Sequence, residues 1–400
     1  MPSPCKLAAM GMVNALGADP DAIWRRVLAG DQSAFAPHPE LAAGGAWLLG
    51  GVEDAWLPRI PDGLARYACR NNAFTLAALE QIEDAVRDAV AAVGPERVGV
   101  VMGTSTSGSG ECEAAILHET RHGSLLPEFR YEQLELGGAA GFLAELFDLR
   151  GPAFSISTAC SSGARALASA RSLLALGLCD AVLAGGSDSL CGLTTHGFAS
   201  LSAVSARITN PFSRNRDGLT LGEGAALFLV TRESDGIQLL GVGESSEAHH
   251  ISAPDPEGRG AAASMRGALH DAGVDAAQVA YLNLHGTGTR QNDAMESRAV
   301  AQVLGAEVPC SSTKPLVGHC LGAAGAIELA FCWQALRARS RGALPLIPHR
   351  YDGESDPELA PIRLCGDGEA VPASGACLVM TNSFGFGGNN CTLLIGEARA

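Results

Sequence analysis

One unit recurs along this chain: a short apolar strand, a chemically reactive residue at its end, and then an apolar helix. Residues 154–157 are predicted to be a strand leading to Cys160, and residues 161–176 carry apolar side chains at helical spacing. Residues 279–284 are predicted to be a second such strand, which leads to His285. Because short buried strands alternate with longer helices, the sequence predicts a layered α/β fold.

The same rhythm occurs on both sides of residue 245, which predicts two similar halves, residues 1–245 and 246–400. The first half contains the cysteine unit and the second contains the histidine units. Further strands are predicted at residues 98–102, 181–186, 225–230, 238–243, 309–313, 377–382 and 390–395. Helices are predicted at residues 265–273, 294–304 and 323–336, after a surface loop over residues 247–262.

The composition limits the possible functions. The chain has 400 residues, of which 47% are hydrophobic and 49 are glycine, enough for two closely packed α/β halves. Its formal charge is −15, so we expect no binding of nucleic acid, which requires a basic surface. An acidic protein partner would have to dock on a local basic patch.

The cysteines and the apolar segments indicate the compartment. The twelve cysteines contain no CxxC pair, so most are expected to be small buried side chains in a reducing cytoplasm. The N-terminus lacks the pattern of a secretory signal, and no uninterrupted run of 18 apolar residues occurs. The sequence therefore predicts a cytoplasmic protein without a membrane span.

Cys160 is the candidate nucleophile. It lies among small residues at a tight turn before an apolar helix, which permits the strained geometry of a nucleophile elbow. A helix N-terminus favours the thiolate, because unpaired N–H groups and the helix dipole point toward the sulfur. The alternative, a buried inert cysteine, fits the other eleven cysteines better.

His285 and His319 are the candidate groups for stabilising an oxyanion. Each lies between small residues after a predicted strand, which lets an imidazole approach a bound ligand. A lone histidine more often fills a core or surface position, and this interpretation is given to His38, His118, His122, His196, His249, His250, His270 and His349. A cysteine with two such histidines suits acyl transfer through a thioester, followed by carbon–carbon bond formation.

Two further segments are candidates to support this chemistry. Lys314 lies in an apolar loop and needs a carboxylate partner to keep its charge, for which Glu328 and Glu296 are candidates. Residues 385–389 form a Gly-rich turn around Phe386, whose backbone N–H can face an oxyanion while its ring acts as a gate. The alternatives are a solvated lysine and a plain turn between two strands.

Together and in order, these segments resemble the β-ketoacyl-acyl carrier protein synthase family, of the Cys-His-His kind used in fatty acid and polyketide elongation. The resemblance covers nearly the whole chain and includes residues 11–17, 185–188, 210–218 and 222–224. It implies the thiolase-like fold, in which two similar α/β halves form five αβαβα layers. It also implies a dimer, with the site between the two halves of each chain.

The resemblance assigns roles to the candidate residues. Cys160 resembles the acyl-accepting nucleophile of the family. His285 and His319 resemble the pair that binds the malonyl thioester carbonyl and promotes decarboxylation. Lys314 resembles the supporting lysine, and Glu328 resembles the supporting carboxylate.

The resemblance also implies how substrates bind and react. Thr287 and Thr289 resemble the threonines that bond the phosphopantetheine arm of acyl carrier protein, and the backbone N–H groups of Cys160 and Phe386 would form the oxyanion hole. The implied reaction is a decarboxylative Claisen condensation of the Cys160-bound acyl group with malonyl-acyl carrier protein, giving 3-oxoacyl-acyl carrier protein. No metal and no diffusible cofactor are expected, because the substrates are carried on phosphopantetheine.

Pocket and docking residues are expected as follows. Thr106 resembles a residue that is contributed across the dimer, near the floor of the acyl pocket, and Phe198 is expected to line the same pocket. A small residue at the floor would admit a longer chain. Arg59, Arg66 and Arg70 form a basic cluster, which predicts a docking surface for an acidic carrier protein. The alternative is a set of solvated arginines on a helix face.

Some residues depart from the usual family pattern. Pro315, Cys320 and Asn389 stand where small polar residues are usual. The Lys314–Pro315 pair and residues 70–72 resemble synthases of aryl polyene and xanthomonadin-type pigment clusters. That sub-family would imply stiff unsaturated substrates with an aryl head, and a heterodimer with a chain-length-factor subunit in place of a homodimer.

Two other functions are compared with this one. A catalytically silent partner subunit, of the chain-length-factor kind, would be expected to lack the nucleophile, whereas Cys160 and both histidines are present. A thiolase would be expected to show a second active cysteine in a Cys-x-Gly turn near the C-terminus. Neither Cys365 nor Cys391 fits that pattern.

Overall fold

The computed structural model describes residues 3–41, 47–340, 342–372 and 377–397. Its main strands are β1 (Cys5–Asn14), β4 (Val98–Gly103), β5 (Ala153–Ile156), β6 (Ala181–Asp188), β7 (Gly224–Thr231), β8 (Ile237–Ser246), β9 (Val279–Asn283), β10 (Pro309–Ser311), β12 (Arg363–Leu364), β14 (Leu378–Gly385) and β15 (Asn389–Glu397). They are hydrogen-bonded in the order β12-β10-β9-β14-β15-β8-β1-β7-β6-β4-β5. Two small pairs lie apart from them, β2 (Ala36–Pro37) with β3 (Leu48–Leu49) and β11 (Ala343–Pro345) with β13 (Ala370–Pro372).

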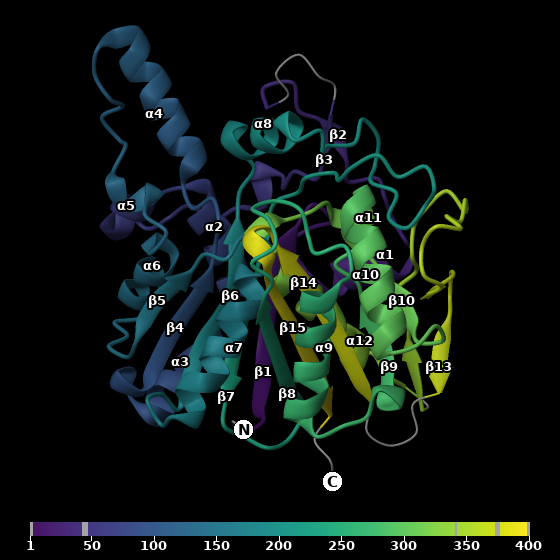
Figure 1. Ribbon diagram of the computed structural model, residues 1–400. Coiled ribbons are helices and arrows are strands. Elements are labelled where there is room, and N and C mark those ends of the chain that lie inside the picture. Colours follow the sequence, from purple (N-terminus) through teal and green to yellow (C-terminus); the bar gives the residue numbers. More distant parts are fainter. Residues whose placement is uncertain (1–2, 42–46, 341, 373–376, 398–400) are drawn as a thin grey trace.

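The α-helices surround these strands. They are α1 (Pro20–Leu28), α2 (Arg70–Glu80), α3 (Glu83–Val93), α4 (Ser109–His122), α5 (Tyr131–Leu134), α6 (Gly138–Leu146), α7 (Ser162–Ala175), α8 (Gly192–Ser200), α9 (Arg259–Ala272), α10 (Arg290–Val303), α11 (Lys314–Val317) and α12 (Ala324–Arg337). Figure 1 shows α4 projecting from the upper left of the molecule, away from the strands. Among the described residues, no helix combines the length and the apolar character that crossing a bilayer requires.

One strand pattern occurs twice. β1 runs antiparallel to β7 and β7 antiparallel to β6, whereas β6, β4 and β5 are parallel. β8, β15, β14, β9 and β10 repeat this order and these directions. The two sets meet where β1 pairs with β8 through Cys5–Leu239 and Lys6–Gln238. The repeat favours a boundary before β8, and the division at residue 245 stays a prediction.

Two helices separate the two sets of strands. α7 packs on β6 and β4, α12 packs on β14 and β15, and the two helices contact each other. Their buried side chains, including Leu167 and Ile327, belong to one hydrophobic cluster. α2 and α6 cover the outer face of the first set, and α9 covers the outer face of the second (Figure 1). This is the five-layer αβαβα arrangement that the sequence predicts.

The differences from the predicted elements lie at their edges. β1 was not among the predicted strands, because its sequence mixes Lys6 and glycine with the apolar residues of a buried strand. α9 begins at Arg259, so the loop predicted over residues 247–262 ends earlier than expected. α10 begins at Arg290 because Thr289 precedes a polar first turn, whereas the prediction began the helix at the apolar residues.

The catalytic candidates follow strands that end on one side of the molecule. β9, β10 and β14 are mutually parallel, and Figure 1 shows their carboxyl ends at the top, together with those of β4, β5 and β6. The segment after β5 carries Cys160, the segment after β9 carries His285, and the segment after β10 carries Lys314 and His319. The short turn Phe386–Gly388 follows β14. The topology therefore gathers the candidates into one region.

Candidate active site

Cys160 occupies a strained turn between β5 and α7. Ala159, the residue before it, has φ +53°, a left-handed conformation that residues with a Cβ rarely adopt. The turn is tightly packed, since a Cβ on Gly103 would lie 2.4 Å from the backbone nitrogen of Gly163. A Cβ on Gly163 would lie 3.0 Å from the carbonyl oxygen of Gly322. The small residues around the cysteine are therefore required by the close approach of three backbone segments.

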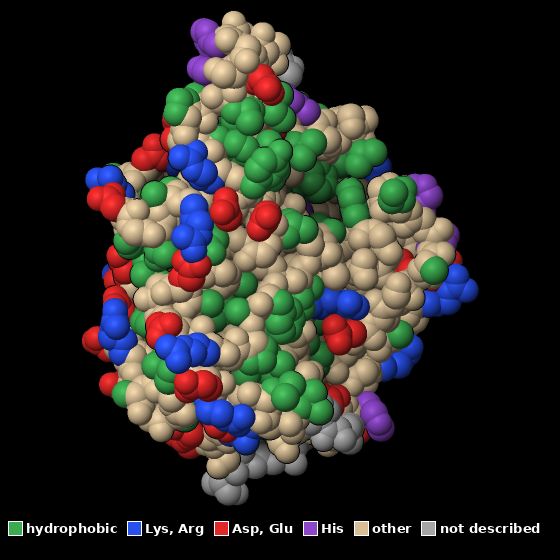
Figure 2. All heavy atoms as spheres, turned by 90° about the vertical axis from the view of Figure 1, so that its left-hand side faces the viewer, with side chains coloured by type: hydrophobic (Ala, Val, Ile, Leu, Met, Phe, Trp, Pro, Cys, Tyr) green, Lys and Arg blue, Asp and Glu red, His purple; other side chains and the backbone are tan. Residues whose placement is uncertain are grey.

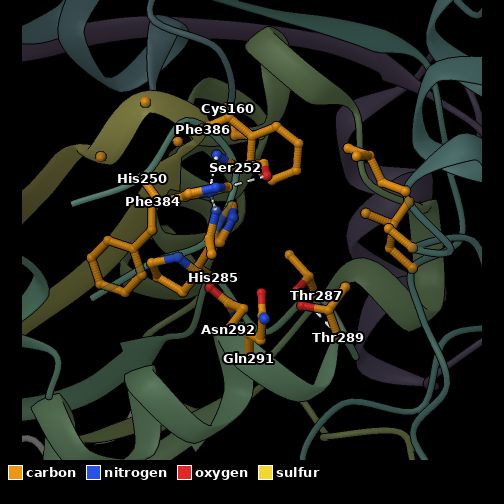
Figure 3. A pocket seen from close by; sticks show the side chains of 18 of the residues that line it. Cys160, His250, Ser252, His285, Thr287, Thr289, Gln291, Asn292, Phe384 and Phe386 are labelled. Carbon is orange, nitrogen blue, oxygen red and sulfur yellow. Dashed lines mark hydrogen bonds between the residues drawn. The ribbon is translucent and has the colours of Figure 1, made fainter. Parts of the chain in front are cut away.

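Both predicted histidines meet at this cysteine. Nε2 of His319 lies 3.0 Å from Sγ of Cys160, and the centroids of the His285 and His319 rings are 5.3 Å apart. All three side chains are buried, and their donor atoms lie within 4.8 Å of one another. Figure 3 shows Cys160 and His285 at the inner end of one pocket. The structure thus brings together three residues that are far apart in the sequence.

The three reactive side chains are uncharged in the free protein. Burial lowers the pKa of His285 and of His319 well below the usual histidine value, and the Lys314 ammonium lowers both further. Burial also raises the pKa of the Cys160 thiol to about 11, although Lys314 and the backbone N–H of Phe386 act in the opposite direction. Desolvation therefore acts against the thiolate that the helix terminus is expected to favour.

Lys314 pairs with Glu328, the first of its two predicted partners. Nζ of Lys314 donates to Oε1 of Glu328 at 2.5 Å and to the carbonyl oxygen of His285 at 2.5 Å. The same nitrogen lies 3.4 Å from Nδ1 of His285, so Nδ1 faces a donor and the ring proton of neutral His285 belongs on Nε2. Lys314 therefore fixes the tautomer in which His285 can donate a hydrogen bond from Nε2.

Glu296, the other predicted partner of Lys314, positions His285 instead. Its two carboxylate oxygens accept the backbone N–H groups of His285 at 2.8 Å and Gly286 at 2.7 Å. Burial raises the pKa of this carboxyl to about 7. The sequence signal is an acidic residue that directly follows two apolar residues on the predicted helix after His285. Its role depends on which loop that helix faces, which a single sequence does not state.

Asp188 is a third buried carboxylate near the site, and the sequence analysis does not single it out as functional. Its oxygens accept the backbone N–H groups of Ser105, Thr106 and Gly322, at 2.8, 2.9 and 2.5 Å. It therefore ties the loop after β4 to the turn before α12, which lie on either side of the Cys160 elbow. The signal in the sequence was an acidic residue at the end of the predicted strand 181–186.

A pocket of about 300 Å³ leads outward from Cys160. Thr287 and Thr289 line it, with their hydroxyl oxygens 2.9 Å apart, and Figure 3 shows them across the pocket from the cysteine. The backbone N–H of Phe386 faces the Cys160 sulfur and acts to lower the pKa of the thiol. The Phe386 ring packs against Phe198 in a tilted arrangement, with centroids 5.4 Å apart. The pocket thus has a reactive inner end, a polar wall with two hydroxyls and an aromatic wall.

Thr106 is not among the residues that line this pocket. It is buried, and its hydroxyl donates to Asp188 at 2.9 Å. Within this single chain, the Thr106 side chain therefore belongs to the Asp188 network. The prediction that Thr106 lies at the floor of the partner subunit's acyl pocket concerns the dimer and stays a prediction. Phe198, the other predicted pocket residue, does line the pocket.

The three predicted docking arginines are each paired with a carboxylate. Arg59 contacts Asp62 at 2.7 Å, and Arg66 contacts Glu145. The Arg70 side chain is only 30% exposed, because it contacts the buried Glu223 at 2.6 Å and also Asp54. The charge of Arg70 is therefore paired within the protein. Docking of a carrier protein through Arg59, Arg66 and Arg70 stays a prediction.

The same three reactive residues are also the set of described side chains that could hold a metal ion. A Cys-His-His set suits zinc or copper by ligand type. However, the Lys314 ammonium lies 3.4 Å from Nδ1 of His285 and would repel a cation bound to that ring. The charge of the site favours an anion that develops during a reaction over a bound cation.

A buried cysteine that faces two neutral imidazoles and an N–H donor, on a doubled α/β fold, defines a condensing enzyme of thioester chemistry. Residues 4–236 match the family model "Beta-ketoacyl synthase, N-terminal domain", and residues 238–345 match "Beta-ketoacyl synthase, C-terminal domain". The chain therefore belongs to the β-ketoacyl synthase family, as its sequence predicts.

Individual relatives agree with this assignment. The chain is 31% identical to 3-oxoacyl-[acyl-carrier-protein] synthase 2 of Coxiella burnetii, with 97% of both chains covered. It is 44% identical to a chain of the solved complex of the ketosynthase ApeO with its chain length factor ApeC from Xenorhabdus doucetiae, with a TM-score of 0.93 and 99% and 98% of the two chains covered. A β-ketoacyl synthase from Burkholderia phymatum is 30% identical, with a TM-score of 0.86 and full coverage of both chains.

Proposed function

We propose that this protein catalyses the decarboxylative Claisen condensation of an acyl thioester, held on Cys160, with malonyl-acyl carrier protein. The observation that carries the proposal is the 3.0 Å contact between Nε2 of His319 and Sγ of Cys160, with His285 beside them in the same buried pocket. The product is 3-oxoacyl-acyl carrier protein. Both substrates arrive on phosphopantetheine, so the reaction uses no metal and no diffusible cofactor.

The first half-reaction is the transfer of an acyl group to Cys160. Sγ attacks the carbonyl carbon of the incoming thioester, the new thioester bond forms, and the phosphopantetheine thiol leaves with the proton that the cysteine gives up. Backbone N–H groups of Cys160 and Phe386 hold the oxyanion of the tetrahedral intermediate. Because the resting thiol is neutral and 3.0 Å from the neutral His319, the proton moves as the sulfur attacks.

The second half-reaction uses the two imidazoles. Malonyl-acyl carrier protein enters past Thr287 and Thr289, and its thioester carbonyl accepts hydrogen bonds from Nε2 of His285 and His319. The carboxylate leaves as carbon dioxide, and the electron pair of the broken C–C bond forms an enolate. The enolate carbon attacks the carbonyl carbon of the Cys160 thioester, a new C–C bond forms, and the C–S bond to Cys160 breaks. The cysteine sulfur leaves as a thiolate and takes up one proton from solvent, which restores the resting thiol. The donors in this step are neutral imidazoles, since burial disfavours the imidazolium.

The partners we propose are acyl carrier protein and a second subunit of the same fold. β5 is an edge strand of the described sheet, and Figure 2 shows hydrophobic side chains gathered on the face that carries β5 and α4. Phe154 on β5, Ile116 on α4 and Leu193 on α8 are at least 38% exposed. The similarity to a ketosynthase complex with a chain length factor favours a heterodimer over a homodimer. Native mass spectrometry of the co-expressed pair would distinguish the two assemblies.

We also propose stiff unsaturated acyl chains with an aryl head as the substrate class, and the cytoplasm as the place of the reaction. Phe198, Phe384 and Phe386 give the pocket an aromatic lining that suits a conjugated chain. All twelve cysteines are unpaired, and all except Cys112 are buried, which suits a reducing compartment. Faster condensation with aliphatic than with aryl-polyenoyl carriers would contradict the substrate class.

The experiment that tests the reaction is a condensation assay with defined carriers. Wild-type protein is incubated with acyl-carrier protein and malonyl-acyl carrier protein, and the 3-oxoacyl product is measured by mass spectrometry. His285→Ala and His319→Ala are expected to abolish the product, whereas His270→Ala, at an exposed position of α9, is expected to leave it unchanged. Equal activity in all four proteins would refute the proposal.

A further inference from the structure

His349 is a buried histidine outside the pocket, and it joins two loops that border the site. Its Nδ1 lies 3.1 Å from the backbone nitrogen of Ser312, and its Nε2 lies 3.0 Å from the carbonyl oxygen of Pro211. The Ser312 N–H can only donate and the Pro211 carbonyl can only accept. The ring is therefore neutral, with its proton on Nε2, and it uses both nitrogens at once.

Ser312 connects His349 to the two segments that carry His285 and Lys314. It is fully buried, and its Oγ donates to the carbonyl oxygen of Gly286 at 2.7 Å. The backbone N–H of Lys314 lies 3.3 Å from the same Oγ. Gly286 follows His285 directly, and Nζ of Lys314 donates to the His285 carbonyl. Ser312 thus contacts the backbone on both sides of the lysine–histidine pair.

The segments that His349 joins are closely packed and hydrogen-bonded to the loop that carries His285. A Cβ on Gly286 would lie 2.6 Å from Cβ of Ser312, so the Ser312 side chain already packs closely against the Gly286 backbone. On the other side of the ring, the residue after Pro211 is Phe212, whose backbone N–H donates to Asp293 at 2.8 Å. Asp293 accepts the backbone N–H of Gly288 at 3.2 Å. His349 therefore closes a chain of hydrogen bonds that starts and ends on the loop carrying His285.

We propose that His349 is a positioning residue for the decarboxylation step. It fixes Ser312, and through Ser312 it sets the backbone positions of Gly286 and Lys314, from which His285 reaches the malonyl carbonyl. This inference rests on the proposed condensation. The elbow that holds Cys160 is instead braced by α7 and Asp188, so acylation of the cysteine does not depend on His349.

Two substitutions separate this role from a general effect on stability. His349→Asn keeps an acceptor near the Nδ1 position, where the Ser312 N–H points. His349→Gln keeps a donor near Nε2, toward the Pro211 carbonyl, and leaves the Ser312 N–H without a partner. The two variants are similar in polarity, so a difference between them reports the Ser312 contact.

The experiment measures two half-reactions and the melting temperature of each variant in the full chain. Acylation of Cys160 is followed by intact-protein mass spectrometry, and decarboxylation is followed as carbon dioxide released from malonyl-acyl carrier protein. We expect His349→Gln to slow decarboxylation by roughly 10- to 100-fold, as small misplacements of catalytic groups do, while acylation changes less than about twofold. His349→Asn is expected to keep most of the decarboxylation rate.

Two results would overturn the inference. One is an equal loss of both half-reactions in step with the melting temperature, which would indicate a purely structural role. The other is a decarboxylation rate in His349→Gln that matches wild type or His349→Asn. If wild-type protein itself neither acylates nor decarboxylates, the proposed function fails instead, so the two failures are distinguishable.

Discussion

Replacing Lys314 by methionine would leave a carboxylate alone in the centre of the site. Nζ of Lys314 is 2.5 Å from Oε1 of Glu328, and the two side chains are 1% and 3% exposed. Methionine fills most of the lysine volume, so the main change is the loss of the charge. Breaking a buried ion pair by removing one partner typically costs about 3–5 kcal/mol. We expect Lys314→Met to lower the free energy of unfolding by that order at pH 8.

The loss should depend on pH with a definite sign. Burial raises the pKa of Glu328, and Lys314 opposes this rise, so removing Lys314 raises the pKa further. A carboxyl whose pKa is higher in the folded than in the unfolded protein contributes its full stabilisation at pH values below the unfolded-state pKa. This stabilisation is lost as the pH rises through the folded-state pKa. The destabilisation by Lys314→Met should therefore be smaller at pH 5.5 than at pH 8.

Urea unfolding followed by circular dichroism at these two pH values measures both effects. The control is Lys314→Met combined with Glu328→Leu, which removes both charges and should recover much of the lost stability. Three results would refute the reasoning: a loss below about 1 kcal/mol at pH 8, a loss that does not change with pH, or a double variant no more stable than Lys314→Met alone.

Three further predictions follow from the geometry. Gly103→Ala should lower the melting temperature strongly, because the new Cβ would lie 2.4 Å from a backbone nitrogen of the elbow. The control is Gly63→Ala, at a position with open space around it, which should leave the melting temperature unchanged. Equal shifts in the two variants would contradict this prediction. Alkylation of Cys160 should accelerate about tenfold per pH unit up to pH 10, since its pKa is raised to about 11, and a plateau near pH 9 would indicate an ordinary thiol. Arg70→Ala should lower the melting temperature with little change in KM for the carrier, since the arginine neutralises buried Glu223. An increase in KM without a change in melting temperature would indicate instead that Arg70 docks the carrier.

Much of this fold could be predicted because its strands are short apolar runs with glycine and polar residues around them. The Cys160 turn and the loops of His285 and His319 follow such strands, so their sequence positions already indicated one site. β1 was missed because a strand buried in the centre of a sheet need not alternate, and its lysine interrupts the apolar run.

Other features depend on partners that are distant in the sequence. Lys314 had two candidate carboxylates, and only the packing of α12 and α10 shows that Glu328 pairs with it while Glu296 holds the backbone at His285. Arg70 was interpreted as a surface charge because its partner, Glu223, is 153 residues away. The pKa of Cys160 depends on how deeply the thiol is buried, and the sequence pattern of a helix N-terminus does not show this.

The most direct test of the account is intact-protein mass spectrometry after incubation with an acyl-carrier protein in the absence of malonyl-acyl carrier protein. Wild-type protein and His285→Ala are expected to gain the mass of one acyl group, because the histidine acts only in the second half-reaction. Cys160→Ala is expected to gain none. An adduct on Cys160→Ala, or no adduct on wild type with any aliphatic or aryl-polyenoyl carrier, would contradict the central claim that Cys160 is the acyl acceptor.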